Sequence, residues 1–185
     1  MNKTLSDKKV QELKKQGPKY IRRVISHQQT FQTTPDKLYP LLCPTTEYDW
    51  IDGWHCELVY SKSLYQEYNL IFKTDFFNFE ETWIMSHVEP NRVLEFVRVS
   101  ENISIKVDIT ICDNLNGTCT GNWIIYATAL TPQGNEILKQ MKPEDEPIGI
   151  LLGALDYYIK NDEMQPLPNG IFNKKEHPEG RIHMQ

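Results

Sequence analysis

The clearest pattern in the chain is a strict alternation of apolar and polar residues over positions 103–111. Isoleucine or valine occupies each odd position, and serine, lysine, aspartate or threonine occupies each even position. Successive side chains of a strand point to opposite faces of a sheet, so this alternation predicts a strand with one buried face and one solvent-facing face. Strands of this kind are typical of antiparallel sheets, and we therefore expect an antiparallel sheet.

Six further strands are predicted from shorter or less regular patterns. Each is rich in apolar, β-branched or aromatic residues and is bounded by turn-like segments. Together with the alternating stretch they make a sheet of seven strands. The six predicted ranges are 20–32, 56–62, 65–73, 80–88, 93–100 and 119–130.

Threonine–proline pairs mark two helix starts, since threonine caps a first turn and proline is compatible with it. Thr34-Pro35 begins a short helix that ends before position 44, and Thr131-Pro132 begins the C-terminal helical region. Residues 6–16 form a further predicted helix, which is basic and has little apolar surface.

A long C-terminal helix is predicted to cover the sheet. Pro143 divides the C-terminal region into helices at roughly 132–141 and 144–161. In the second helix, apolar residues recur three and four positions apart, which makes a stripe wide enough to pack on a sheet. Gly149 and Gly153 either permit a close approach to the strands or leave space beneath the helix. The stripe consists of Ile148, Leu151, Leu152, Leu155, Tyr158 and Ile159.

The order of these elements indicates the fold class. One strand, a short helix, six strands and a long helix follow one another without the crossovers of a parallel sheet. This order predicts an α+β protein in which a curved, seven-stranded antiparallel sheet wraps around the C-terminal helix. That arrangement is the helix-grip fold.

A specific stretch of sequence agrees with this fold. Residues 43–61 read CPTTEYDWIDGWHCELVYS, and this CPxxEYxWIxGW stretch resembles a branch of the SRPBCC superfamily, the START-like and pollen-allergen-like proteins. Residues 81–83 and 95–99 resemble the same branch. The resemblance implies a deep, largely apolar cavity between the sheet and the C-terminal helix. Members of the superfamily bind lipids, sterols, polyketides or other hydrophobic molecules, and some catalyse cyclisation or dehydration.

The domain boundaries follow from the extent of this resemblance, roughly 20–161. We expect a basic N-terminal helix or arm at 1–19, an SRPBCC-like ligand-binding domain at 20–163, and an extended tail at 164–185. The tail is punctuated by proline and glycine, which do not favour regular structure.

Composition bears on whether such a cavity exists. The chain has 185 residues, of which 39% are hydrophobic and 11% aromatic. This apolar fraction is modest, but the aromatic rings are large and either fill a solid core or line a hollow one. Four cysteines without a CxxC pair predict free thiols.

Charge and hydropathy restrict the partners. Residues 1–23 carry eight cations and two anions, although the whole chain has a net charge of −5. We expect no nucleic-acid partner, because the basic arm lacks interleaved aromatics and the acidic body repels phosphate. We expect no membrane insertion and a cytoplasmic location, because no apolar run has the length of a membrane span or the form of a secretion signal. The oligomeric state, including a homodimer, is left open.

The first group of candidate binding residues is aromatic. Tyr48, Trp50 and Trp54 fall between the short helix and the second strand, where the resemblance places the mouth or back wall of the cavity. Indoles there offer a flat apolar face and one N–H donor to a ligand ring. The alternative is that these side chains only pack the helical turn against the sheet.

The second group is charged, and its position depends on which face of strand 93–99 is buried. If Phe96 and Arg98 point inward, the guanidinium is available to a ligand carboxylate or phosphate. If the other face is buried, Glu95 is inside instead, and a third alternative leaves the charge on the outer face. A buried charge needs a partner, and the candidates are Glu67, Glu81 and His87, the last sharing a face with Trp83.

No catalytic residue is assigned from the sequence, which lacks GxSxG, HExxH and a phosphate-binding glycine loop. Cofactors are not expected. A metal site is not expected either, because Cys43, Glu47, His55 and Cys56 match no common zinc spacing. A carboxylate or histidine in a desolvated cavity is still a candidate for general acid–base work.

Three hypotheses follow. The leading one is a protein that binds a small hydrophobic, aromatic or lipid-like ligand in the cavity. The alternative is an enzyme of the polyketide cyclase or dehydratase kind that uses the same cavity, and the third is a partner-binding module that uses the basic helix or the tail. The cavity candidates are Tyr48, Trp50, Trp54, Glu67, Glu81, Trp83, His87, Phe96, Arg98 and Leu152.

Overall fold

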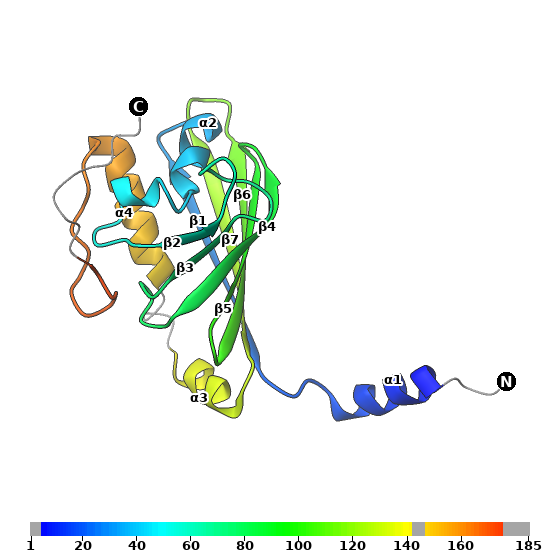
Figure 1. Ribbon diagram of the computed structural model, residues 1–185. Coiled ribbons are helices and arrows are strands. Elements are labelled where there is room, and N and C mark those ends of the chain that lie inside the picture. Colours follow the sequence, from blue (N-terminus) through cyan, green and yellow to red (C-terminus); the bar gives the residue numbers. More distant parts are fainter. Residues whose placement is uncertain (1–4, 142–146, 176–185) are drawn as a thin grey trace.

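The computed structural model describes residues 5–141 and 147–175. Across these residues, seven strands form one antiparallel sheet in the order β1-β7-β6-β5-β4-β3-β2 (Figure 1). The predicted α+β class and the predicted sheet are thus confirmed. The strands are β1 (Arg22–Phe31), β2 (Glu57–Tyr60), β3 (Ile71–Thr74), β4 (Glu81–Glu89), β5 (Val93–Val99), β6 (Ile103–Asp113) and β7 (Cys119–Ala129).

The strand with the clearest alternation behaves as predicted. In β6 the odd positions from Ile103 to Ile111 are buried, and the even positions are more exposed. The third strand differs, since it was expected from 65 but begins at Ile71. Asn69 has a left-handed φ of 66°, and the N–H of Leu70 bonds to the carbonyl of Glu67, so 65–70 turns as a loop.

The positions of the helices also agree with those predicted from the sequence. Thr131 caps α3 as predicted, because its hydroxyl accepts a hydrogen bond from the N–H of Gly134 at 3.1 Å. Thr34 precedes α2 without a side-chain cap. The predicted start of the last helix at 144 lies outside the described residues. The helices are α1 (Leu5–Gln16), α2 (Pro35–Leu38), α3 (Pro132–Gln140), α4 (Pro147–Asn161) and the 3-10 turns η1 (Tyr39–Leu42) and η2 (Glu47–Asp49).

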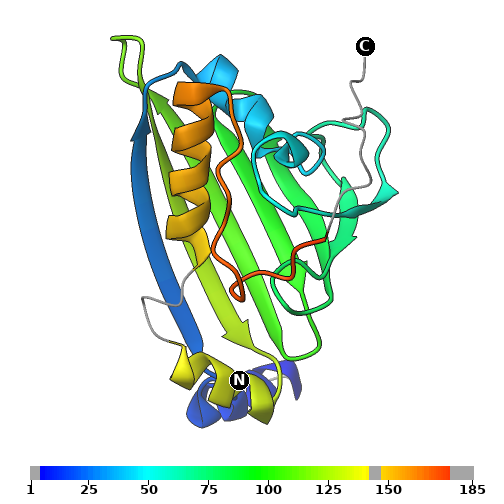
Figure 2. The same cartoon turned by 90° about the vertical axis from the view of Figure 1, so that its left-hand side faces the viewer.

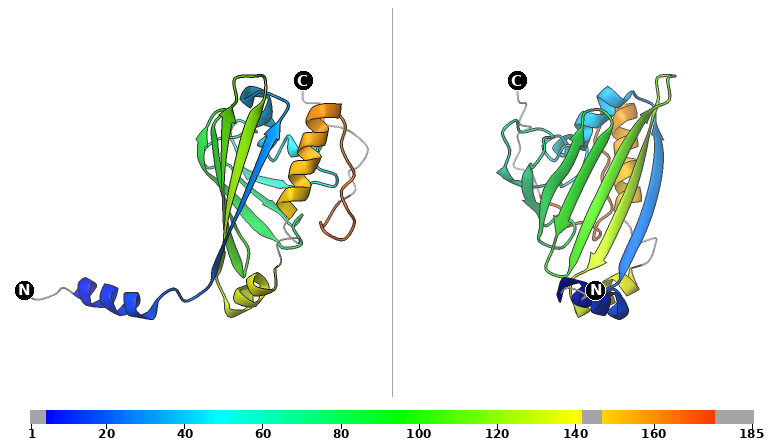
Figure 3. Two further views of the ribbon diagram at one scale, coloured as in Figure 1. Left: turned by 180° about the vertical axis from the view of Figure 1, so that it is seen from behind. Right: turned by 90° about the vertical axis from the view of Figure 1, so that its right-hand side faces the viewer.

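Helix α4 lies against one face of the sheet, whose other face is turned to solvent (Figures 2 and 3). Its buried side is made by Leu151, Leu152, Ala154 and Leu155. Gly149 and Gly153 are both exposed. A Cβ at Gly149 would lie 3.8 Å from Cε1 of His27 on β1, whereas a Cβ at Gly153 would have no neighbour within 4 Å. Gly149 thus lies close to a strand, which is one of the two roles considered, while Gly153 has neither role.

The chain after α4 runs back over the domain in extended form (Figure 2). Leu167 and Phe172 are buried, and the ring of Phe172 stacks on that of Phe76 with centroids 4.8 Å apart. Backbone contacts reinforce this packing, including a hydrogen bond of 2.9 Å from the N–H of Asn173 to the carbonyl of Phe76. Segment 164–175 is thus part of the folded body, whereas α1 buries none of its residues and projects away from it (Figure 1).

Candidate ligand-binding cavity

A cavity of about 100 Å³ lies between the sheet and α4. Leu152 lines it from the helix, together with Leu151 and Leu155, and Val107 and Ile109 line it from β6. Among the described lining residues, seven are aromatic, so large rings serve as walls. These seven are Trp50, Trp54, Phe72, Phe77, Trp83, Phe96 and Trp123.

Strand β5 places a guanidinium at the cavity. Leu94 and Phe96 are buried on the inner face, and Arg98 continues that face and lines the cavity. Glu95 lies on the outer face, where its carboxylate pairs with the Lys106 ammonium at 3.2 Å. Of the alternatives left open by the sequence, the structure therefore has Arg98 inside and Glu95 outside.

Arg98 has a buried partner. Its Nη1 donates to Oε2 of Glu81 at 3.1 Å, and both side chains are largely withdrawn from solvent, with exposed fractions of 12% and 6%. The guanidinium also lies over the rings of Phe77 and Trp83, at 4.5 and 4.9 Å from their centroids. Glu81 is not among the lining residues, so it neutralises the charge of Arg98 without itself facing the cavity.

Trp50 and Trp54 line the cavity, and the indole N–H of each is hydrogen-bonded to a backbone carbonyl. The indole of Trp50 donates to the carbonyl of Leu41, and that of Trp54 donates to the carbonyl of Pro44, each at 2.8 Å. Both alternatives considered from the sequence therefore apply in part, because these side chains fasten the segment and also offer apolar surface to the cavity.

Tyr48 lies outside the cavity lining. Its hydroxyl accepts a hydrogen bond from the N–H of Cys56 at 2.8 Å and donates to the Cys56 carbonyl at 3.1 Å. Burial raises the pKa of Tyr48 to about 12. This tyrosine thus joins the segment after η1 to the start of β2 and does not face a ligand in the cavity.

Two other candidates are also away from the cavity. Glu67 lies in the loop before β3, where hydrogen bonds from the Lys62 N–H and the Ser61 hydroxyl hold its pKa below the ordinary value. His87 is exposed and pairs with Glu89 at 3.2 Å. The register of β4 shifts between Met85 and His87, so the expected alternation from Trp83 is broken and His87 turns to the outer face.

Glu47 is a cavity residue that was not among the candidates. It begins η2 and lines the cavity beside Trp50 and Trp54. Burial raises the pKa of Glu47 to about 8, and part of its surface remains accessible, which fits a carboxyl that faces a cavity. The only signal in the sequence was its place in the CPxxEYxWIxGW stretch, because an irregular turn has no periodicity that indicates an inward face.

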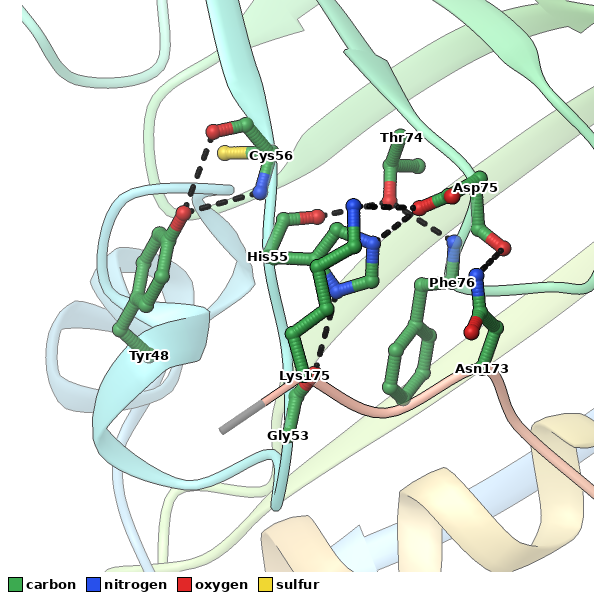
Figure 4. Close-up of polar contacts among 9 residues, drawn as sticks. All are labelled: Tyr48, Gly53, His55, Cys56, Thr74, Asp75, Phe76, Asn173 and Lys175. Carbon is green, nitrogen blue, oxygen red and sulfur yellow. Dashed lines mark hydrogen bonds and ion pairs between the residues drawn. The ribbon is translucent and has the colours of Figure 1, made fainter. Parts of the chain in front are cut away.

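A cluster of polar contacts surrounds His55 and Asp75 (Figure 4). The Nε2 of His55 bonds to Asp75, which also pairs with Lys175 at 3.2 Å. The hydroxyl of Thr74 donates to the His55 carbonyl at 2.7 Å. These bonds fasten the segment before β2, the turn after β3 and the C-terminal segment to one another, and we assign them a structural role.

Neither metal-binding nor membrane-spanning features are found in the described chain. Within residues 5–141 and 147–175, no group of three or more His, Cys, Asp or Glu side chains is arranged to hold a metal ion. None of the helices in these ranges is both long and apolar enough to cross a bilayer.

Comparison with known proteins shows the fold. No protein-family model and no curated protein matches the sequence. Norcoclaurine synthase from Thalictrum flavum, solved with dopamine and hydroxybenzaldehyde, has a TM-score of 0.58 at 11% identity, and the match covers 79% of this chain and 91% of that one. Ara h 8.0201 has a TM-score of 0.54 at 9% identity over 76% and 99% of the two chains.

DynU16, from the dynemicin biosynthetic locus, has a TM-score of 0.52 at 14% identity. The match covers 76% of this chain and 48% of DynU16, so the chain spans about half the length of that protein. At such identities the likeness establishes the fold, and this chain is an α+β protein with the helix-grip fold, as its resemblance to the SRPBCC superfamily implies.

Proposed function

We propose that the protein binds a small, largely apolar molecule in the cavity between the sheet and α4. The observation that carries this proposal is a cavity of about 100 Å³ with aromatic and aliphatic walls. An apolar cavity of about 150 Å³ in another protein stays dry and binds benzene, so the smaller volume here limits the enclosed part of a ligand to a single small ring. The norcoclaurine synthase structure, of the same fold, contains two single-ring compounds, dopamine and hydroxybenzaldehyde.

The expected affinity for a simple ring is modest. Shielding about 150 Å² of apolar ligand surface at about 25 cal/mol per Å² is worth about 4 kcal/mol, which corresponds to a Kd on the order of 1 mM. Tighter binding of a natural ligand requires polar contacts in addition to burial.

Filling the cavity should weaken this binding. Val107 lines the cavity from β6, and V107F adds a ring to a space of about 100 Å³. We expect the wild-type protein to bind toluene with a Kd on the order of 1 mM and V107F to show at least a tenfold weaker affinity, because the space is occupied. Ligand-observed NMR titration measures both values.

The matched control is V24F, the same substitution at an exposed position of β1. It should bind toluene as the wild type does. Thermal unfolding of all three proteins shows whether V107F is folded at the temperature of the titration. Equal toluene affinity in V107F and the wild type, or no binding by the wild type, would contradict the proposed function.

A second candidate function is acid–base catalysis of a cyclisation, and Glu47 is the observation that favours it. Its pKa of about 8 leaves both protonation states accessible near neutral pH, and Arg98 lines the same cavity. In an intramolecular aldol closure, the Glu47 carboxylate takes a proton from carbon, the carbon–carbon bond forms, and the proton returns to the carbonyl oxygen.

This candidate is tested with a short linear poly-β-ketone and detection of the cyclised product by mass spectrometry. We expect E47Q to lose at least about 100-fold in rate, the usual contribution of a general base. The control E101Q changes an exposed carboxylate in the turn before β6 and should keep the full rate. An absence of product with the wild type, or equal rates for E47Q and the wild type, excludes this reaction.

A further inference from the structure

Glu47 lines the cavity, and its carboxyl group has no partner among the described residues. Within residues 5–141 and 147–175, its side chain takes part in no hydrogen bond and no ion pair, and burial is the sole cause of its raised pKa. A carboxylate withdrawn from water is costly unless a cation or a set of donors compensates it. In the ligand-free protein the group therefore keeps its proton at neutral pH.

The charged groups around the cavity do not supply that compensation. Arg98 is already paired with Glu81 at 3.1 Å, so this ion pair contributes no net charge to the wall. The thiols of Cys43 and Cys56 lie near Glu47, but burial raises their pKa values, that of Cys56 to about 12, and both remain neutral. The lining residues from α4 are all apolar. Two buried donors from the lining residues, Arg98 Nε and Trp83 Nε1, have no partner among the described residues, but neither adds an uncompensated charge. A cation that pairs with an ionised Glu47 therefore comes from a ligand.

The surrounding walls are suited to such a cation. Seven of the described lining residues are aromatic, and two of them, Trp50 and Trp54, belong to the same short segment as Glu47. Aromatic faces attract ammonium groups, and a carboxylate in an aromatic enclosure combines this attraction with a charge-assisted hydrogen bond. A neutral ligand would leave the carboxyl protonated and gain neither interaction.

We propose that the cavity selects small organic amines, bound as ammonium ions that donate to the Glu47 carboxylate while their hydrocarbon part packs against the aromatic walls. This inference rests on the function proposed above and specifies the chemistry of the ligand. Binding then couples to a proton, because Glu47 must ionise before it accepts the ammonium.

The coupling has a definite sign. Below pH 8 the free protein holds a proton on Glu47, and each amine bound releases one proton to solvent. The affinity for an amine therefore rises by up to about tenfold per pH unit until Glu47 is ionised. A neutral ligand of the same shape binds without this dependence.

Three probes of nearly the same size separate the contributions of charge, hydrogen bonding and apolar burial to the affinity. They are benzylamine, benzyl alcohol and toluene. We expect calorimetric or NMR titration at pH 6, 7 and 8 to show benzylamine affinity increasing at each step and exceeding that of benzyl alcohol by at least about tenfold at pH 8. In E47Q this preference and the pH dependence should both disappear. The control E101Q should behave as the wild type does.

The outcomes distinguish the two proposals. If toluene binds and benzylamine shows neither tighter binding nor a rise with pH, the amine preference is wrong and the apolar binding function stands. If none of the three probes binds the folded wild-type protein, the proposed function itself fails. Stronger binding of benzoate than of benzylamine would also overturn the inference, because it would show that the cavity favours an anion.

Discussion

Replacing Glu81 by leucine should lower the free energy of unfolding by about 3–5 kcal/mol. Glu81 and Arg98 form a buried ion pair, with 6% and 12% of the side chains exposed and 3.1 Å between Oε2 and Nη1. Removing the carboxylate leaves the guanidinium withdrawn from water without a counter-ion, which is the costly case for a buried pair. Urea unfolding of the wild type and E81L measures the difference.

The double variant E81L/R98M should recover most of this loss, since an apolar pair of similar volume fills the same space without a charge. Glu95 and Lys106 provide the control on the outer face of the same sheet, where the exposed fractions are 28% and 41%. E95L should cost less than about 1 kcal/mol because solvent screens that pair. If E81L costs no more than E95L, the pair does not have the buried character assigned to it.

In the ligand-free protein, the ionisation of Glu47 should make the free energy of unfolding depend on pH. The pKa of this carboxyl is raised from 4.5 to about 8 on folding, so the folded state holds a proton that the unfolded state has lost across that window. The stabilisation from this proton is fully present below about pH 4.5 and is lost as pH rises through 8. Relative to E47Q, the wild type should lose up to about 1.4 kcal/mol per pH unit between these limits.

Urea unfolding of both proteins from pH 4.5 to 9 measures this difference. Asp75 and Glu67 have pKa values lowered by their hydrogen bonds, but they are present in both proteins and their effects cancel. We expect E47Q to be the more stable protein above pH 8. Parallel stability curves across the window would show that Glu47 ionises in the folded state as it does in the unfolded chain.

Most of the fold could be predicted because local patterns reflect local geometry. The alternation over 103–111 follows from the two-residue repeat of a strand, and the observed burial of β6 agrees with it. Thr131 and Pro132 begin α3 because a cap and a first turn depend only on neighbouring residues. Such signals do not require knowledge of the rest of the chain.

The candidate site was less predictable because periodicity defines two faces without saying which one is buried. On strand 93–99 the alternation allowed either Arg98 or Glu95 to be the buried charge. The packing of the sheet against α4 placed Arg98 at the cavity and Glu95 on the outer face. The register shift after Met85 turned His87 outward, and no residue of β4 gives a sequence signal for this shift. The sequence did not indicate Glu47 as a cavity residue, because an irregular turn has no periodicity that predicts a buried face.

The sequence by itself determined the α+β class, the seven predicted strands, the C-terminal helix and the aromatic residues at 50, 54 and 83 that line the cavity. Only the tertiary structure decided that Glu47 and Arg98 line the same cavity and that Glu81 neutralises one of them from behind the wall. Local elements arise from short-range geometry and burial, whereas the pairing and desolvation of charges depend on which distant segments meet when the sheet closes over the helix.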